Sequence, residues 1–220
     1  SLKQTIRQAK QVPVLINYLV NGKRVEKRPE KFDLDLLEKI ERLEIPYWFP
    51  VDELPDGFNT RQPRGSHGIS HVHHFYTKRN LWVLAAIYIR CSLRSRLVFQ
   101  SIVTTLTSRL VRYNMGNRGN GSLNGTLYIA SLNAEAEILK VLSGKFSDFL
   151  KAIKINNRSV CLLQSFSSIN CQENCVDYLF IDPPFGANLN YSELNFNWEA
   201  WLKVKTNAES EAIENSVQKK

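Results

Sequence analysis

The residues best suited to chemistry lie near the end of the chain, where the apolar run Asp177–Asp182 leads into Pro183, Pro184 and Phe185. The run predicts a buried strand, and in open α/β sheets ligands collect beyond the carboxyl ends of strands. The Asp182 carboxylate and the Pro183 carbonyl can each accept one N–H of an amino group and so hold its nitrogen towards a methyl donor. Proline offers no competing N–H, and Phe185 can stack on a base. A plain strand, a proline-stopped turn and a packing aromatic would give the same pattern.

The segments around this motif predict an α/β second half. Val160–Leu163 and 177–182 are expected as strands, and Gly125–Ala130 as a strand or extended segment. Residues 133–152 predict a helix, and another helix is expected through Leu194, Trp198 and Trp201. These elements place the acid and the two prolines between a strand and a helix, as the chemistry requires.

The first half predicts an appendage to that sheet. Asn21-Gly22 within the alternating residues 12–28 indicates a β-hairpin. Asp33 is expected to cap a short amphipathic helix that reaches Arg42, and residues 45–70, rich in proline and glycine, to form an extended, irregular arm. Helices are expected at about 77–91, with Thr77 as the N-cap, and at 97–113.

Longer stretches of the chain resemble a known family. Asp182–Phe185 is similar to the signature of S-adenosylmethionine-dependent DNA methylases that act on adenine N6 or cytosine N4. One bacterial and archaeal group of these enzymes continues like 185–202 and also carries stretches like His71–Leu81, Gly125–Ile129 and Glu211–Asn215. The resemblance extends from about residue 33 to the end of the chain and is most specific at 182–202.

The resemblance implies a Rossmann-like methyltransferase sheet, present in part, with residues 1–70 as the N-terminal hairpin, helix and arm and 71–220 as a partial catalytic domain. It implies methyl transfer from S-adenosylmethionine to a DNA amino group, adenine N6 rather than cytosine N4. The catalytic residues would be Asp182, Pro183, Pro184 and Phe185. Thr77 and Asn80, at a helix N-terminus, would contact the cofactor's methionine carboxylate, and Gln164 and Ser165 its adenine. Capping and turn formation are the alternative roles of these polar residues.

The family's glycine loop, of the form Asp-Pro-Phe-x-Gly-x-Gly, does not occur in this sequence. Gly116, Gly119 and Gly121 do not replace it, because they follow a predicted helix and not a strand. We therefore expect the chain to be a fragment whose partners include the rest of the methylase polypeptide or a second copy. A non-catalytic DNA-binding portion of a split methylase is the alternative, and an RNA amino-methyltransferase is a third possibility.

The charge distribution favours a polyanionic partner. The chain has 29 Lys and Arg against 21 Asp and Glu, and no carboxylate lies between Asp56 and Glu135. A surface that faces phosphates excludes carboxylates, so we predict DNA binding. A solvated basic face, or an acidic protein partner, would also explain the bias. The expected phosphate contacts are Lys78, Arg79, Arg90, Arg94, Arg96, Arg109, Arg112 and Arg118.

Other classes of site find less support in the sequence. Four histidines lie within eight residues, at 67, 71, 73 and 74, but no cysteine or carboxylate near them completes a metal shell, so we expect no metal. Four cysteines in 220 residues are too few for a disulfide scaffold. No run is long enough to span a membrane, and no signal-peptide pattern opens the chain. We expect a cytoplasmic protein without a membrane partner.

Overall fold

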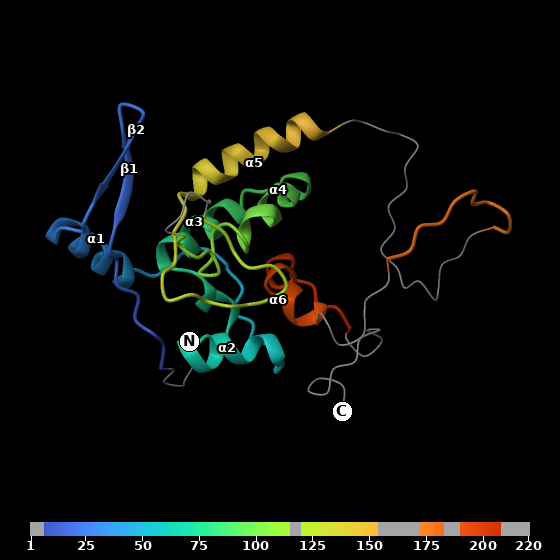
Figure 1. Ribbon diagram of the computed structural model, residues 1–220, viewed down its shortest axis with the longest axis horizontal. Coiled ribbons are helices and arrows are strands. Elements are labelled where there is room, and N and C mark those ends of the chain that lie inside the picture. Colours follow the sequence, from blue (N-terminus) through green and yellow to red (C-terminus); the bar gives the residue numbers. More distant parts are fainter. Residues whose placement is uncertain (1–6, 115–119, 154–171, 183–189, 208–220) are drawn as a thin grey trace.

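A computed structural model of the chain describes residues 7–114, 120–153, 172–182 and 190–207 (Figure 1). In this part of the chain a two-stranded hairpin precedes a group of packed helices, so the architecture is mixed α and β. The elements are β1 (Ile16–Val20), β2 (Lys23–Lys27), α1 (Lys31–Arg42), α2 (Phe58–His67), the short 3₁₀ helix η1 (Val72–Phe75), α3 (Lys78–Tyr88), α4 (Leu93–Val103), α5 (Ile138–Ala152) and α6 (Tyr191–Leu202).

The predicted hairpin is confirmed. Asn21 and Gly22 form its turn with φ values of 50° and 77°, the left-handed conformation that this dipeptide tolerates. The strands pair antiparallel, with Tyr18 opposite Val25. Helix α1 follows, and Asp33 is its third residue and not its N-cap: Glu30 is the N-cap and exchanges reciprocal hydrogen bonds with Asp33 in a capping box.

Local hydroxyl groups set the bounds of α3 and α4. Thr77 caps α3 as predicted, its Oγ1 accepting the Asn80 N–H at 3.2 Å. Helix α4 begins at Leu93, after a Ser92 cap, and ends at Val103, so the expected range 97–113 is wrong at both ends. The following residues form turns in which the Thr107 and Ser108 hydroxyls donate to backbone carbonyls. Such bonds compete with helix continuation, which explains the early end.

The arm predicted at 45–70 contains a helix that the sequence does not reveal. Residues 58–67 form α2 despite Pro63 inside it, and its N-cap is Gly57, which has no side chain to cap it. A residue of α6 supplies the missing cap, as described below. The proline and glycine content therefore predicts the wrong structure at 58–67, because a side chain distant in the sequence accepts a hydrogen bond from the helix N-terminus.

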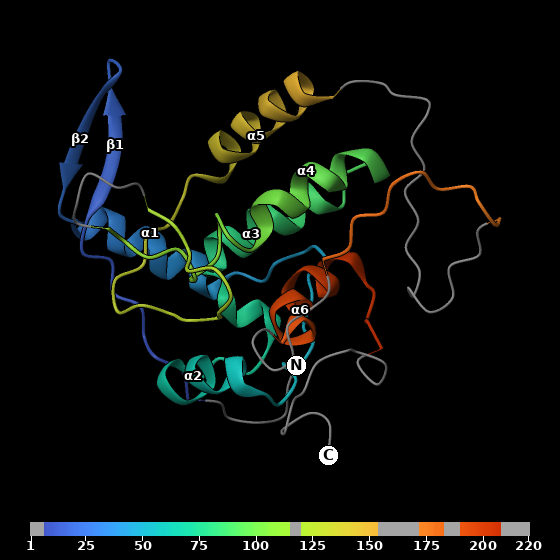
Figure 2. The ribbon, with the colours of Figure 1, turned by 45° about the vertical axis from the view of Figure 1, so that its right-hand side comes forward.

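Aromatic packing around α6 forms the core. Trp201 is fully buried, and its ring contacts Phe99 and Tyr88 at centroid distances of 5.2 and 5.6 Å. Its indole N–H donates to the Tyr76 hydroxyl at 3.1 Å. The predicted helix through Leu194 and Trp201 is therefore confirmed. Helix α6 joins α3 and α4 in one core cluster and also contacts α2 (Figure 2).

The segment expected as a strand or extended chain at 125–130 forms no strand, although two of its apolar side chains are buried. Leu127 and Ile129 are 2% and 1% exposed. The Gln62 side chain accepts the Ile129 N–H at 3.1 Å and donates to its carbonyl at 3.3 Å, taking the place of a neighbouring strand. Helix α5 begins only at Ile138, five residues later than expected, because the Glu137 side chain caps it.

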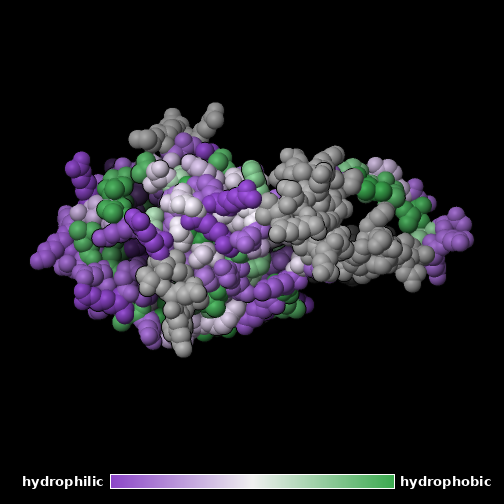
Figure 3. Space-filling model, turned by 90° about the horizontal axis from the view of Figure 1, so that it is seen from below, coloured by the Kyte–Doolittle hydropathy of each residue, from purple (hydrophilic) through white to green (hydrophobic). Residues whose placement is uncertain are grey.

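The expected buried strand at 177–182 is not present. These residues are extended without strand pairing, and Tyr178 and Phe180 are 81% and 78% exposed. Figures 1 and 2 show the segment away from the helices, and Figure 3 shows its apolar side chains at the right-hand end of the molecule. A strand needs a hydrogen-bonded neighbour and apolar cover, and its expected neighbour, 160–163, lies outside the described residues. In the described ranges the only sheet is the hairpin, so they contain no Rossmann-like sheet.

Candidate functional site

Asp182, the first residue of the predicted catalytic motif, has an exposed side chain at the end of the segment 172–182. Its carboxylate is therefore accessible to an incoming group. The other catalytic residues, Pro183, Pro184 and Phe185, lie outside the described residues. The same holds for two predicted cofactor contacts, Gln164 and Ser165, and for the predicted phosphate contact Arg118.

Thr77 and Asn80, the other predicted cofactor contacts, have partners within the fold. The Thr77 hydroxyl caps α3 and also donates to Glu135 Oε1 at 2.5 Å. Arg79 forms an ion pair with the same carboxylate, its Nε lying 3.2 Å from Oε1. The Asn80 amide, 7% exposed, donates to the Thr107 carbonyl at 2.9 Å. The N-terminus of α3 thus already holds a carboxylate from the chain itself, in keeping with the attraction of helix N-termini for anions.

The predicted phosphate contacts do not all face solvent. Arg90, Arg94 and Arg112 are exposed. The Arg96 guanidinium lies over the Tyr88 ring, 4.9 Å from its centroid, and Lys78 donates to the Glu41 carbonyl at 2.5 Å. Arg94 and Arg112 can therefore meet a polyanion without breaking a contact of this kind. Arg90, although exposed, donates to the Ala86 carbonyl at 2.7 Å and lies 5.7 Å from the centroid of the Tyr47 ring.

Arg109 is buried, with 7% of its surface exposed, and has no carboxylate partner among the described residues. Its Nη1 donates to the His74 carbonyl at 3.2 Å, and its Nε is buried without a partner in this part of the chain. Its backbone N–H donates to the Phe75 carbonyl at 2.7 Å, and its carbonyl accepts the Asn133 amide at 2.7 Å. Burial lowers the pKa of the guanidinium. These hydrogen bonds keep Arg109 and its charged side chain in a buried position.

Histidine rings lie beside this arginine. The ring centroids of His73 and His74 are 4.2 Å apart, and those of His71 and His74 are 5.1 Å apart. Burial and the nearby imidazoles lower the pKa of His73 to about 3, and burial, with His71 and Arg109, lowers that of His74 to about 4. These rings are therefore neutral at pH 7. Within the described ranges no three His, Cys, Asp or Glu side chains are placed to hold a metal ion.

Sequence reasoning missed the role of Glu193, which is fully buried. Its Oε2 accepts the backbone N–H of Asn59 at 2.6 Å, at the N-terminus of α2. A Cβ on Gly57 would lie 2.1 Å from the Glu193 carboxyl carbon, so a side chain at this position would displace the carboxylate. On the same face of α6, Asn190 and Asn197 bury amide atoms that have no partner among the described residues. No local pattern in the sequence indicates this contact, because it joins residues 134 positions apart.

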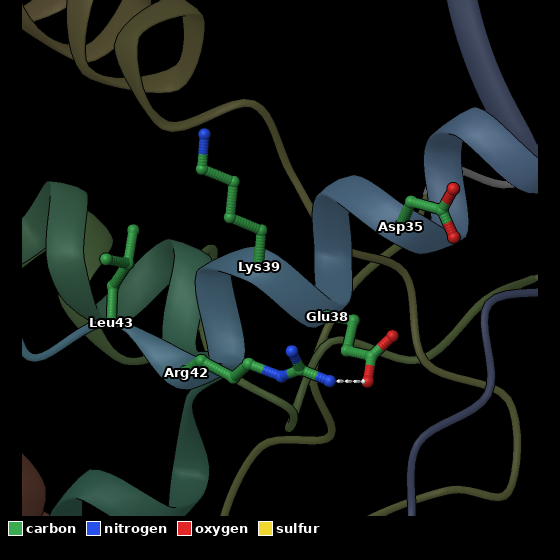
Figure 4. Close-up of a pocket in the computed structure, with 5 residues that line it drawn as sticks. All are labelled: Asp35, Glu38, Lys39, Arg42 and Leu43. Atoms are coloured by element: carbon green, nitrogen blue, oxygen red, sulfur yellow. Dashed lines mark hydrogen bonds and ion pairs between the residues drawn. The ribbon is translucent and has the colours of Figure 1, made fainter.

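Two shallow pockets lie on the surface of the described residues. One lies along α1, where Glu38 and Arg42 point toward each other and form an ion pair one turn apart (Figure 4). This ion pair is exposed to solvent, and such pairs add little to stability. The pocket therefore does not indicate a functional site. A second pocket lies between α4 and α5 and is lined by Leu97, Val98, Ser101, Lys145, Asp148, Phe149 and Ala152.

Comparison of the chain with protein-family models, with curated proteins and with solved structures found no match. None of the helices in the described ranges has the length and apolar character needed to cross a membrane.

Proposed function

We propose that this chain is part of a DNA amino-methyltransferase that acts on adenine N6 rather than cytosine N4. The observation that carries the proposal is the run Asp177–Asp182 followed by Pro183, Pro184 and Phe185, with the family resemblance that is most specific at 182–202. The exposed Asp182 carboxylate supports it, since a catalytic acceptor must be reachable. The proposed fold is a Rossmann-like sheet in which 177–182 becomes a strand once a neighbour covers its apolar side chains.

In the proposed reaction the chain's contribution is positioning. The Asp182 carboxylate and the Pro183 carbonyl each accept one N–H of the target amino group, and Phe185 stacks on a base removed from the duplex. S-adenosylmethionine would supply the methyl group from its sulfonium.

Contacts at the start of α3 bear on where the cofactor would lie. The Thr77 hydroxyl and the Arg79 guanidinium, which face that helix end, both hold Glu135. A methionine carboxylate could take this place only after Glu135 moved away. The described residues thus do not fit the cofactor as they stand.

DNA is the proposed polyanionic partner, and the exposed Arg90, Arg94 and Arg112 support this. They belong to the stretch between Asp56 and Glu135 that has no carboxylate. The contacts of Glu135 favour the second candidate, a non-catalytic DNA-binding portion of a methylase, because such a portion needs no cofactor site.

The test measures transfer of a labelled methyl group from S-adenosylmethionine to duplex DNA, with calorimetric titration of the cofactor beside it. Asp182→Asn should abolish transfer, and the matched control Asp177→Asn should not, since both carboxylates are exposed on the same segment. DNA affinity should be equal in both variants. Equal transfer in Asp182→Asn would refute the assigned role. DNA binding without cofactor binding would favour the second candidate, and transfer to RNA alone would favour the third.

A further inference from the structure

We propose that Arg109 and the histidines beside it form a binding site for a small oxyanion of the phosphate or sulfate class. The proposal needs only an anion and does not depend on the methyltransferase function. It rests on a charge that the described residues bury without neutralising it.

An unpaired charge inside a protein is costly, and natural proteins compensate it with a partner. Of the five N–H donors of a guanidinium, the described residues engage one of Arg109, through the His74 carbonyl. The buried Nε is left without a partner in these ranges. No carboxylate in them forms an ion pair with Arg109, although Arg64 and Arg79 both have one. The free donors are those of a fork that matches an oxyanion.

The histidines supply a further donor. The His74 Nδ1 accepts the Ser70 N–H at 3.3 Å, so the proton of the neutral ring lies on Nε2 and can be donated. His67 lies on the C-terminal turn of α2, and burial and the charge of Arg109 lower the pKa of its imidazole. The Ser66 hydroxyl, which donates to the Gln62 carbonyl, lies 2.7 Å from His67 Nδ1.

The surroundings favour a small ion over a polymer. Only 7% of Arg109 is exposed, whereas a backbone phosphate of DNA would meet the exposed arginines first. The backbone of residues 7–9 also passes close to this region, where the Ala9 N–H donates to the His67 carbonyl at 3.0 Å. A tetrahedral oxyanion is compact, and its charge would offset that of Arg109.

The experiment titrates the chain with inorganic phosphate and with sulfate, chloride keeping the ionic strength constant. Two readouts are the NMR signal of the Arg109 Nε–H and the thermal unfolding midpoint. We expect the signal to shift saturably and the midpoint to rise. Arg109→Met should reduce the affinity by about tenfold or more, as loss of a charge-assisted pair does. Arg28→Met, which removes an exposed guanidinium outside the predicted phosphate contacts, should bind like the unchanged chain.

A purely structural role for Arg109 predicts a different result. The midpoint would then respond to phosphate equally in the unchanged chain and in Arg109→Met, and the proposal would fail. If Arg109→Met does not fold, the Nε–H signal of the unchanged chain decides: no shift at millimolar phosphate or sulfate overturns the proposal. A duplex oligonucleotide identifies the source. A shift with free phosphate supports a small ion, and a shift only with the oligonucleotide overturns that choice.

Discussion

The Glu193 carboxylate accepts a hydrogen bond from the backbone N–H of Asn59 at 2.6 Å, joining α6 to the start of α2 across 134 positions of the chain. Four N–H groups at a helix start lack partners within the helix, and a carboxylate there also interacts favourably with the helix dipole. Because Gly57 cannot cap α2 itself, Glu193 stabilises this end and at the same time fixes α2 against the core.

This relationship predicts that Gly57→Ala destabilises the fold. The new Cβ would lie 2.1–2.5 Å from the Glu193 carboxyl group, so the carboxylate would have to leave the Asn59 N–H and remain buried without it. Loss of such a charge-assisted bond should lower the free energy of unfolding by about 2 kcal/mol or more. Urea unfolding followed by far-UV circular dichroism measures this change.

Gly65→Ala is the matched control, because it lies in the same helix with open space around its Cα. It should raise the free energy of unfolding by about 0.5–1 kcal/mol, the usual gain from replacing glycine in a helix. If the two variants had equal stability, the cap would contribute nothing.

Removing the hydroxyl group of either of two tyrosines beside Trp201 should change the free energy of unfolding by different amounts. Tyr76→Phe removes the acceptor of the Trp201 N–H and leaves that buried donor unpaired, which should cost about 1–3 kcal/mol of unfolding free energy. Tyr88→Phe removes a buried hydroxyl that has no partner among the described residues, so its effect should be close to zero or stabilising. Denaturant unfolding of both variants is the measurement, and a larger loss in Tyr88→Phe would contradict the assigned bond.

Elements fixed by neighbouring residues could be predicted, and elements fixed by distant ones could not. Asn21-Gly22 and Thr77 carry their turn and cap within a few residues, so the hairpin and the start of α3 follow from local chemistry. Helix α2 depends on Glu193, which no local pattern connects to Gly57. The strand expected at 177–182 depends on a pairing partner and an apolar cover, which a short apolar run cannot supply by itself.

The same distinction applies to the candidate site. The sequence marks Asp182 as an acid at the end of an apolar run, and the structure leaves its side chain exposed. The sequence does not indicate that the Glu135 carboxylate would bind the side chains of Thr77 and Arg79, because that contact joins residues more than fifty positions apart. Nor does counting basic residues separate the exposed Arg94 from the buried Arg109.

The histidine cluster predicts loss of stability in mild acid. The pKa of His73 is about 3 and that of His74 about 4 in the folded chain, both below the value of about 6.5 expected when unfolded. The unfolded chain therefore binds protons first, and the free energy of unfolding falls as pH decreases from about 6.5 towards 4. His73 alone should contribute a slope of up to about 1.4 kcal/mol per pH unit in this window.

Urea unfolding at several pH values between 7 and 4.5 measures this slope. His73→Phe, which keeps a flat ring beside Phe49, should make the dependence shallower because one titrating group is lost. A variant with the full slope of the unchanged chain would show that His73 does not titrate differently in the two states.

Charge reversal at Arg94 tests the basic surface without disturbing the core. Arg94 is exposed in the first turn of α4, where an acidic residue suits the helix dipole, so Arg94→Glu should fold at least as well as the unchanged chain. If Arg94 contacts a phosphate, the variant should bind duplex DNA more weakly, and the slope of log affinity against log salt should decrease by about one.

Lys140→Glu, in the first turn of α5 and outside the stretch between Asp56 and Glu135, is the matched control. Fluorescence anisotropy at 50 to 200 mM salt separates the two cases: a general charge effect weakens binding equally in both variants, whereas a contact at α4 weakens it in Arg94→Glu alone.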